Sequence, residues 1–163
     1  MDALHRLRAI ADYQFGGGSG KVLFPEGTEV THSRSTGRPR HVFLKGRRTA
    51  MLRPNDGFLA LTPEGARMLV SGNPHFDFKV IVMEGVSGEI AKGKNVFAKH
   101  VEKAGPKIRP GDEVVVLHPS GQVLAVGKAI LNADEMLAFK TGVAVRVRKG
   151  GLNGMTTSLL EEE

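Results

Sequence analysis

Short apolar runs separated by turn-forming residues dominate this sequence and restrict it to short strands and short helices. Five such runs lie between residues 21 and 61, and each of the four gaps between them contains a glycine. Spacing of this kind predicts a small antiparallel sheet. The predicted strands are residues 22–24, 29–32, 41–44, 49–52 and 58–61.

The N-terminal segment is predicted to be an amphipathic helix, followed by a glycine-rich stretch at residues 16–21. Apolar residues recur at helical spacing from Leu4 to Phe15, and Asp2 is a suitable N-cap. The glycine-rich stretch resembles a phosphate-binding loop, but Phe15 occupies the place of its first glycine and Val22 that of its Ser or Thr. We therefore expect a flexible connection and no nucleotide site.

A second helix is predicted to begin at Thr62, because Pro63 and Glu64 follow it in the order typical of a helix start. Gly, Asn and Pro at residues 71–74 end this helix and mark a domain boundary. The sequence therefore divides into an α+β module at residues 1–74, a second domain at 75–150 and a flexible tail at 151–163. The second domain is expected to contain a buried strand at 78–83, a type II turn at 109–112, strands at 114–117 and 123–126, and a helix opening at Asn132 or Asp134.

Residues 84–101 are predicted to form a helix, a turn and a strand that together seat a polyanion. Gly93 is suited to end the helix, since glycine readily adopts the left-handed conformation that a C-cap needs. Lys92 and Lys94 flank it, and a strand-like segment follows at residues 96–101. In a strand at residues 142–148, the valines alternate with Ala144, Arg146 and Arg148. The arginine face binds a nucleic-acid backbone or, alternatively, keeps a sheet edge soluble.

Net charge favours nucleic acid as the partner. The chain carries a net charge of +6, and its pI of about 9.8 exceeds the value of about 9 typical of nucleic-acid-binding domains. A membrane surface is disfavoured because no basic amphipathic helix displays Trp or Phe. Arg34, Arg38 and Arg40 either hold further phosphates or form a solvated hairpin tip.

Recognisable catalytic and metal-binding patterns are missing from the sequence. There is no cysteine, and the six histidines lack metal-ligand spacing. No nucleophile elbow occurs. The acidic pairs Asp112-Glu113 and Asp134-Glu135 lie at a turn and at a helix start, where acidic residues are favoured for structural reasons. We therefore expect no autonomous enzyme, no cofactor and no metal. Without a membrane-length apolar segment or a signal peptide, a cytoplasmic protein is expected.

Two sets of short motifs follow one another in a fixed order along the chain. The later set is residues 93–99 (GKNVFAK), 108–114 (IRPGDEV), 124–129 (LAVGKA), 135–139 (EMLAF) and 142–148 (GVAVRVR); the earlier set is residues 11–16 (ADYQFG), 35–38 (STGR), 56–57 (DG) and 64–67 (EGAR). The later set resembles the PUA domain, and more narrowly the PUA domain at the C-terminus of archaeosine tRNA-guanine transglycosylase. The earlier set resembles the module that precedes PUA in that enzyme.

The resemblance implies an α+β fold, with a small module followed by a β pseudo-barrel of about six strands and two short helices. It also implies RNA binding, in the transglycosylase relatives at the acceptor 3′ end of tRNA, by the first helix, the next strand and the last strand. Lys92 and Arg148 are also predicted to bind RNA, but from the pattern of charges in the sequence and not from the resemblance. The residues that the resemblance places in the groove are Gly93, Lys94, Val96, Phe97, Ala98, Lys99, Val143, Ala144, Val145 and Arg146.

The sequence departs from the transglycosylase family in length and in cysteine content. That family's catalytic barrel holds a cysteine-rich zinc site, whereas this chain has 163 residues and no cysteine. We therefore expect a tRNA-binding protein that serves a separate catalytic, transglycosylase-like subunit. The alternative is a protein-interaction or ribosome-associated module whose RNA affinity is incidental.

Overall fold

A computed structural model of the chain describes residues 2–152. The chain divides into two compact units, Met1–Asp77 and Phe78–Glu163. The division lies three residues beyond the boundary expected from the 71–74 cluster. Among the residues that the structure describes, no helix is both long enough and apolar enough to cross a membrane.

The first unit is built on a four-stranded antiparallel sheet with the order β1-β2-β3-β4. Four of the five predicted strands are confirmed, and the sheet has consecutive strands as neighbours, as short hairpin connections favour. The prediction of a strand at residues 22–24 is wrong, because this segment lies in a helix and its end. The strands are β1 (Glu29–His32), β2 (Pro39–Leu44), β3 (Arg47–Leu52) and β4 (Leu59–Leu61).

The glycine-rich stretch is part of a pair of packed helices, α1 (Ala3–Phe15) and α2 (Ser19–Leu23). The prediction of a flexible connection is therefore wrong. The Gly20 N–H donates to the Asp12 carboxylate at 2.7 Å, and a Cβ at Gly20 would overlap the Arg8 carbonyl. Glycine is thus required here for close helix approach. Asp2 caps α1 as predicted, its side chain accepting a hydrogen bond from the His5 N–H at 2.7 Å.

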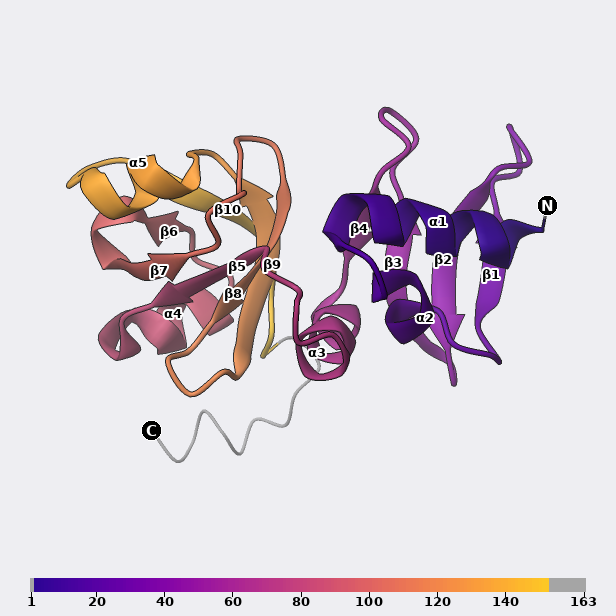
Figure 1. Ribbon diagram of the computed structural model, residues 1–163, viewed down its shortest axis with the longest axis horizontal. Helices are drawn as coiled ribbons and strands as arrows, with labels where there is room; N and C mark the ends of the chain where they lie inside the picture. Colours follow the sequence, from indigo (N-terminus) through magenta and orange to yellow (C-terminus); the bar gives the residue numbers. More distant parts are fainter. Residues whose placement is uncertain (1, 153–163) are drawn as a thin grey trace. The chain divides into compact units, whose positions relative to one another are not determined.

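Helix α3 (Pro63–Gly72) begins as predicted, with the Thr62 hydroxyl accepting the Gly65 N–H at 3.1 Å. It buries Ala66 and Leu69. In Figure 1, α1 and α2 lie in front of the strands of this unit. The apolar side chains of α1, Leu7, Ala11 and Phe15, are buried, so the helices cover one face of the sheet.

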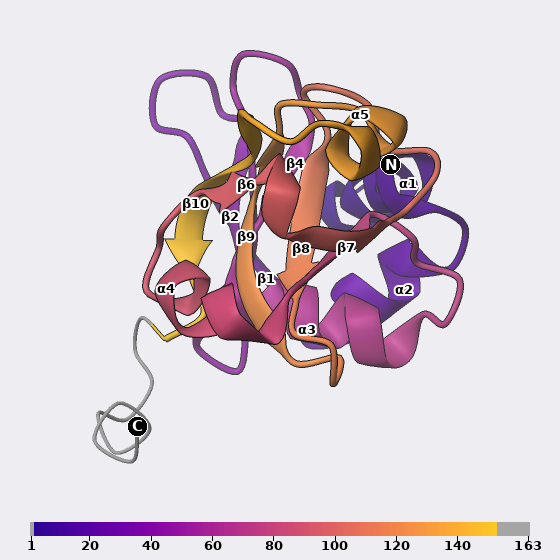
Figure 2. The ribbon, with the colours of Figure 1, turned by 90° about the vertical axis from the view of Figure 1, so that its left-hand side faces the viewer.

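The second unit is a six-stranded sheet with the order β6-β10-β9-β8-β5-β7. Its two outermost strands, β6 and β7, are joined only by the 3-10 turn η2 (Ala98–His100). Such a short connection brings the sheet edges together and curls the sheet into a nearly closed barrel (Figure 2). The predicted pseudo-barrel is confirmed. Its strands are β5 (Lys79–Val82), β6 (Val96–Phe97), β7 (Val101–Ala104), β8 (Glu113–Leu117), β9 (Val123–Ala129) and β10 (Val143–Gly150).

Two short helices, α4 (Ser87–Ala91) and α5 (Ala133–Ala138), lie at opposite ends of this barrel (Figures 1 and 2). Asn132 opens α5 with a full capping box that includes Glu135. The 3-10 turn η1 (Glu84–Val86) precedes α4. The core between them is formed by buried residues of every strand, chiefly valines and alanines.

Three local expectations for the second unit need correction. The predicted strand at 96–101 is interrupted by η2, and β5 alternates between buried Val80 and Val82 and half-buried Lys79 and Ile81 instead of being buried throughout. The first two residues of the expected flexible tail, Gly151 and Leu152, are hydrogen-bonded to the barrel, because their N–H groups donate to backbone carbonyls at 2.6 and 3.1 Å. Residues 153–163 of that tail lie outside the described residues.

Candidate nucleic-acid interface

The predicted lysine turn and arginine strand lie side by side. Strand β6 pairs antiparallel with β10, with Phe97 opposite Val143 and Val96 opposite Val145. The turn that precedes β6 is tied to the same strand, because the Asn95 side chain accepts the Val147 N–H at 2.9 Å. Residues more than forty positions apart in the sequence therefore build one surface at the sheet edge.

The turn between α4 and β6 presents its lysines outward. Gly93 has φ +110°, a conformation that glycine adopts readily, and its N–H donates to the Ile90 carbonyl at 2.9 Å. Lys92, Lys94 and Lys99 are exposed. Lys92 pairs with Glu89 at 3.7 Å, so part of its charge is already compensated within the helix.

Four predicted contact residues direct their side chains into the core. Val96, Ala98, Ala144 and Val145 are each at most 2% exposed. For Ala144 and Val145 the reason is a bulge in β10 between Val143 and Val145, which places two consecutive residues inward. Ala144 therefore does not share a face with Arg146, contrary to the strict alternation assumed from sequence. Of the predicted groove residues of β10, Arg146 is exposed and Val143 is half-buried.

Arg148 has a structural partner. Its guanidinium donates to both carboxylate oxygens of Glu113, to Oε1 at 2.8 Å and to Oε2. The Glu113 side chain is fully buried, whereas that of Arg148 is 39% exposed. This pair joins β10 to β8 across β9. Its charge is therefore shared with a buried carboxylate, and the assignment of Arg148 to the RNA-binding surface stays a prediction.

A concavity of about 300 Å³ opens beside the lysine turn. The Phe97 ring, 44% exposed, is at its rim and contacts His100 edge to face at 6.2 Å between ring centroids. No β10 residue lines this concavity. Sequence reasoning found Lys94 and Phe97 but missed the other lining residues, because η1 and η2, which place several of them, have no period-2 or period-3.6 signal. The lining residues are Gly85, Val86, Glu89, Ile90, Lys94, Asn95, Phe97 and His100.

The arginines proposed as secondary phosphate contacts belong to the first unit. Arg34 and Arg38 are exposed in the β1–β2 hairpin loop, which is closed by a 2.8 Å hydrogen bond from the Ser33 N–H to the Arg38 carbonyl. Arg40 is in β2. Partial burial, and then the charges of Arg48 and Arg40, lower the pKa of the neighbouring His41. Within residues 2–152, none of these three arginines forms an ion pair.

The two units match two described families in the order expected from sequence. Residues 5–75 match the family described as patch-forming domain C2 of tRNA-guanine transglycosylase. Residues 78–151 match the PUA domain. The chain carries a C2 domain followed by a PUA domain. The predicted resemblance is thereby confirmed over most of the chain.

Curated relatives include archaeal tRNA-guanine(15) transglycosylases. That of Methanothermobacter thermautotrophicus is 40% identical over 151 residues, which are 93% of this chain and 23% of the relative. That of Pyrococcus abyssi is 44% identical over 149 residues, 91% of this chain and 25% of the relative. The chain thus spans about a quarter of the length of these relatives.

Two solved structures are similar to this chain over most of its length. A hypothetical protein from Pyrococcus horikoshii is similar with a TM-score of 0.73 at 20% identity, over 91% of this chain and 89% of the other. A conserved PUA domain protein from Thermoplasma acidophilum is similar with a TM-score of 0.64 at 25% identity, over 90% of this chain and 86% of the other. Within residues 2–152, no three His, Cys, Asp or Glu side chains are placed to hold a metal ion.

Proposed function

We propose that this protein binds structured RNA through its PUA domain, and that the bound element is the unpaired 3′ end of a tRNA. One observation carries the proposal: the exposed Phe97 ring at the rim of a mainly apolar concavity, with Lys94 beside it and Arg146 on the paired strand. Membership of the PUA family and similarity to tRNA-guanine(15) transglycosylases support RNA binding connected with tRNA modification.

The geometry fits a single unpaired nucleotide better than a duplex. A volume of about 300 Å³ is at the lower end of the range for small-ligand pockets. A terminal base would stack on Phe97, as bases do on exposed aromatic rings in single-strand-binding proteins. Lys94, Lys99 and Arg146 would meet the phosphates on either side. Backbone groups of the turn would add contacts that do not depend on sequence.

The decisive experiment compares two double variants. One removes two positive charges from this surface, and the other removes two from the other end of the barrel. Lys94→Ala with Arg146→Ala is expected to weaken tRNA binding about tenfold or more, measured by fluorescence anisotropy of labelled tRNA. Lys107→Ala with Arg109→Ala is the matched control, because it removes one lysine and one arginine from the loop beside α5. If both variants bind like the parent protein, RNA is held elsewhere.

Salt dependence provides a separate prediction. If three to five phosphates are neutralised on single-stranded RNA, the logarithm of affinity should fall with the logarithm of salt concentration at a slope of about −2 to −3.5. Removing Lys94 and Arg146 should make the slope shallower by about 1.4, since each lost phosphate contact contributes about 0.7. Anisotropy titrations at several salt concentrations measure both slopes. A parent slope near zero would contradict electrostatic binding.

We infer further that the protein is the non-catalytic RNA-binding partner of a transglycosylase-like catalytic chain. The support is the similarity of both domains to part of such an enzyme. Affinity purification with and without nuclease treatment tests this step. A catalytic chain that stays bound after RNA digestion supports it, and one retained only through RNA favours independent binding to the same tRNA.

A further inference from the structure

Two stacked aromatic rings lie exposed on the first unit, outside the surface discussed so far. Tyr13 of α1 and Phe58, which precedes β4, have ring centroids 6.3 Å apart and planes inclined by only 8°. The Tyr13 residue is 81% exposed and Phe58 is 37% exposed. Within the described part of the chain the Tyr13 hydroxyl has no hydrogen-bond partner. One face of the pair is therefore open to solvent and uncommitted.

The pair is held rigidly by the backbone around it. The Gln14 side chain donates to the Leu59 carbonyl and accepts the Leu59 N–H, both at 2.8 Å, which ties α1 to β4, the outermost strand of the sheet. Phe58 is fixed by its N–H to the Asp56 carboxylate at 2.9 Å and by its carbonyl, which accepts the Arg53 N–H at 2.8 Å. A preorganised ring loses little conformational entropy when a ligand stacks on it.

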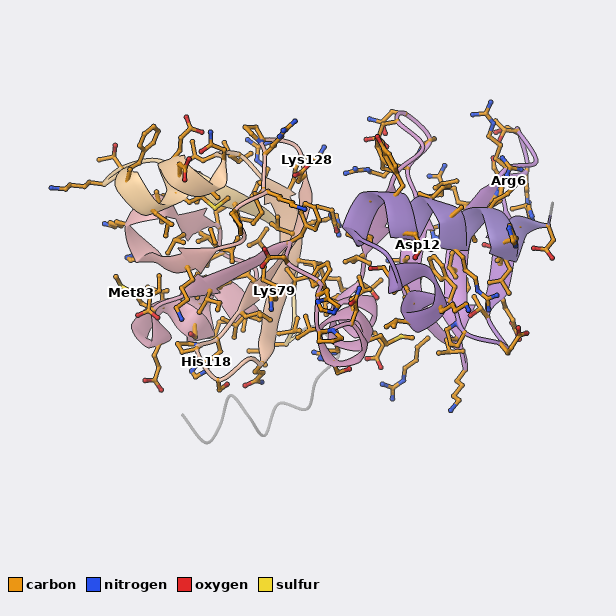
Figure 3. All side chains as sticks on the ribbon, viewed as in Figure 1. Arg6, Asp12, Lys79, Met83, His118 and Lys128 are labelled. Atoms are coloured by element: carbon orange, nitrogen blue, oxygen red, sulfur yellow. The ribbon has the colours of Figure 1, made fainter. Side chains whose placement is uncertain are left out.

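The charges around the pair favour an anion. Arg6 precedes Tyr13 by seven residues, about 10 Å along the same side of α1, and its side chain forms no ion pair among residues 2–152. Of the nearby acids, Asp56 pairs with Arg53 at 3.2 Å, whereas Asp2 and Asp12 accept the N–H groups of His5 and Gly20. Arg6 and Asp12 project from α1 in Figure 3. The unit as a whole carries eleven lysines and arginines against seven acids, a net charge of +4.

We propose that Tyr13 and Phe58 form a stacking platform for an unpaired nucleobase of RNA, with Arg6 receiving a neighbouring phosphate. An aromatic pair beside an uncompensated arginine provides the two interactions that single-stranded nucleic acid needs, a π-face and a cation. A neutral or basic protein segment would use the rings but would leave the arginine without a partner. The inference rests on the proposed function, because it assumes that RNA is the partner, and it assigns a second contact to the C2 domain.

The experiment uses the full chain with Tyr13→Trp, because the protein contains no tryptophan and the introduced one reports on this site alone. Unlabelled tRNA transcript and oligouridylate are titrated while tryptophan emission is recorded, and anisotropy of labelled RNA measures total binding. We expect emission to be quenched in parallel with binding. Tyr13→Ala should weaken binding about tenfold, whereas Tyr13→Phe, which keeps the ring, should bind like the parent.

The outcomes separate this platform from the PUA surface. RNA that binds while emission stays constant would overturn the platform and leave the PUA proposal standing, and it would favour a protein ligand for the rings. Quenching that persists when Phe97→Ala leaves affinity unchanged would retain the platform and overturn the PUA proposal. An absence of RNA binding by the parent protein would overturn both.

Discussion

Replacing Phe97 with alanine is expected to weaken tRNA binding by roughly 5- to 150-fold. Stacking of one base on an aromatic side chain contributes about 1–3 kcal/mol, and each 1.4 kcal/mol corresponds to about a tenfold change in affinity. Phe97 is at the rim of the concavity and 44% exposed, so its removal should leave the fold intact. Anisotropy of labelled tRNA measures the affinity, and urea unfolding measures the stability.

Phe139 is a matched control for this experiment. It follows α5, at the other end of the barrel from α4, and is 45% exposed. Phe139→Ala removes the same side chain with nearly the same exposure and should leave affinity unchanged. A Phe97→Trp variant keeps a stacking surface and should bind as the parent does. Equal affinities for Phe97→Ala and Phe139→Ala would place the bound nucleotide away from the concavity.

A tRNA that lacks its terminal unpaired nucleotides extends the same prediction. If the base on Phe97 comes from the 3′ end, the shortened tRNA should bind the parent protein about as weakly as full-length tRNA binds Phe97→Ala. The Phe97→Ala variant should then discriminate little between the two RNAs. Strong discrimination by this variant would show that the 3′ end is recognised by other residues.

Periodicity and turn chemistry predicted those elements whose sequence obeys a single local rule. Thr62 and Asn132 cap helices because a side-chain oxygen before a helix accepts its free N–H groups. Gly111 adopts φ +93° at the turn where Pro110 precedes it. These choices depend on neighbouring residues alone, so the sequence contains the needed information.

The predictions that proved wrong concern segments whose structure depends on contacts with residues far away in the sequence. Residues 19–23 are helical because Gly20 permits a close approach to Arg8 and donates to Asp12, both in α1. In β10 the inward and outward faces change at the bulge opposite β6, so alternation misplaced Ala144. Glu113 gave no sign of its role, since a carboxylate after a turn is ordinary and only the barrel brings Arg148 to it.

The largest stability effect is expected from Arg148→Ala. This change leaves the Glu113 carboxylate, which is fully buried, without the guanidinium that neutralises it. Removing one partner of a buried ion pair typically costs about 3–5 kcal/mol. Because Arg148 is itself 39% exposed, water can enter the vacated space, and we expect a loss near the lower end, about 3 kcal/mol. Urea unfolding measures the loss as a lower midpoint with an unchanged m-value.

Arg146→Ala is the matched control, because Arg146 lies two residues away on the same strand and forms no ion pair among residues 2–152. It should change stability by no more than about 0.5 kcal/mol while weakening RNA binding.

The double variant Glu113→Leu with Arg148→Met should recover most of the lost stability, since apolar replacement of both partners removes the buried charge. If Arg148→Ala unfolds at the parent's urea midpoint, the Glu113 carboxylate does not depend on Arg148 for its stability. Arg148 would then be able to bind an RNA phosphate. The two arginines of β10 thus have different expected roles: Arg146→Ala should lower RNA affinity, and Arg148→Ala should lower stability. Measuring both RNA affinity and the urea midpoint of each variant distinguishes the two roles.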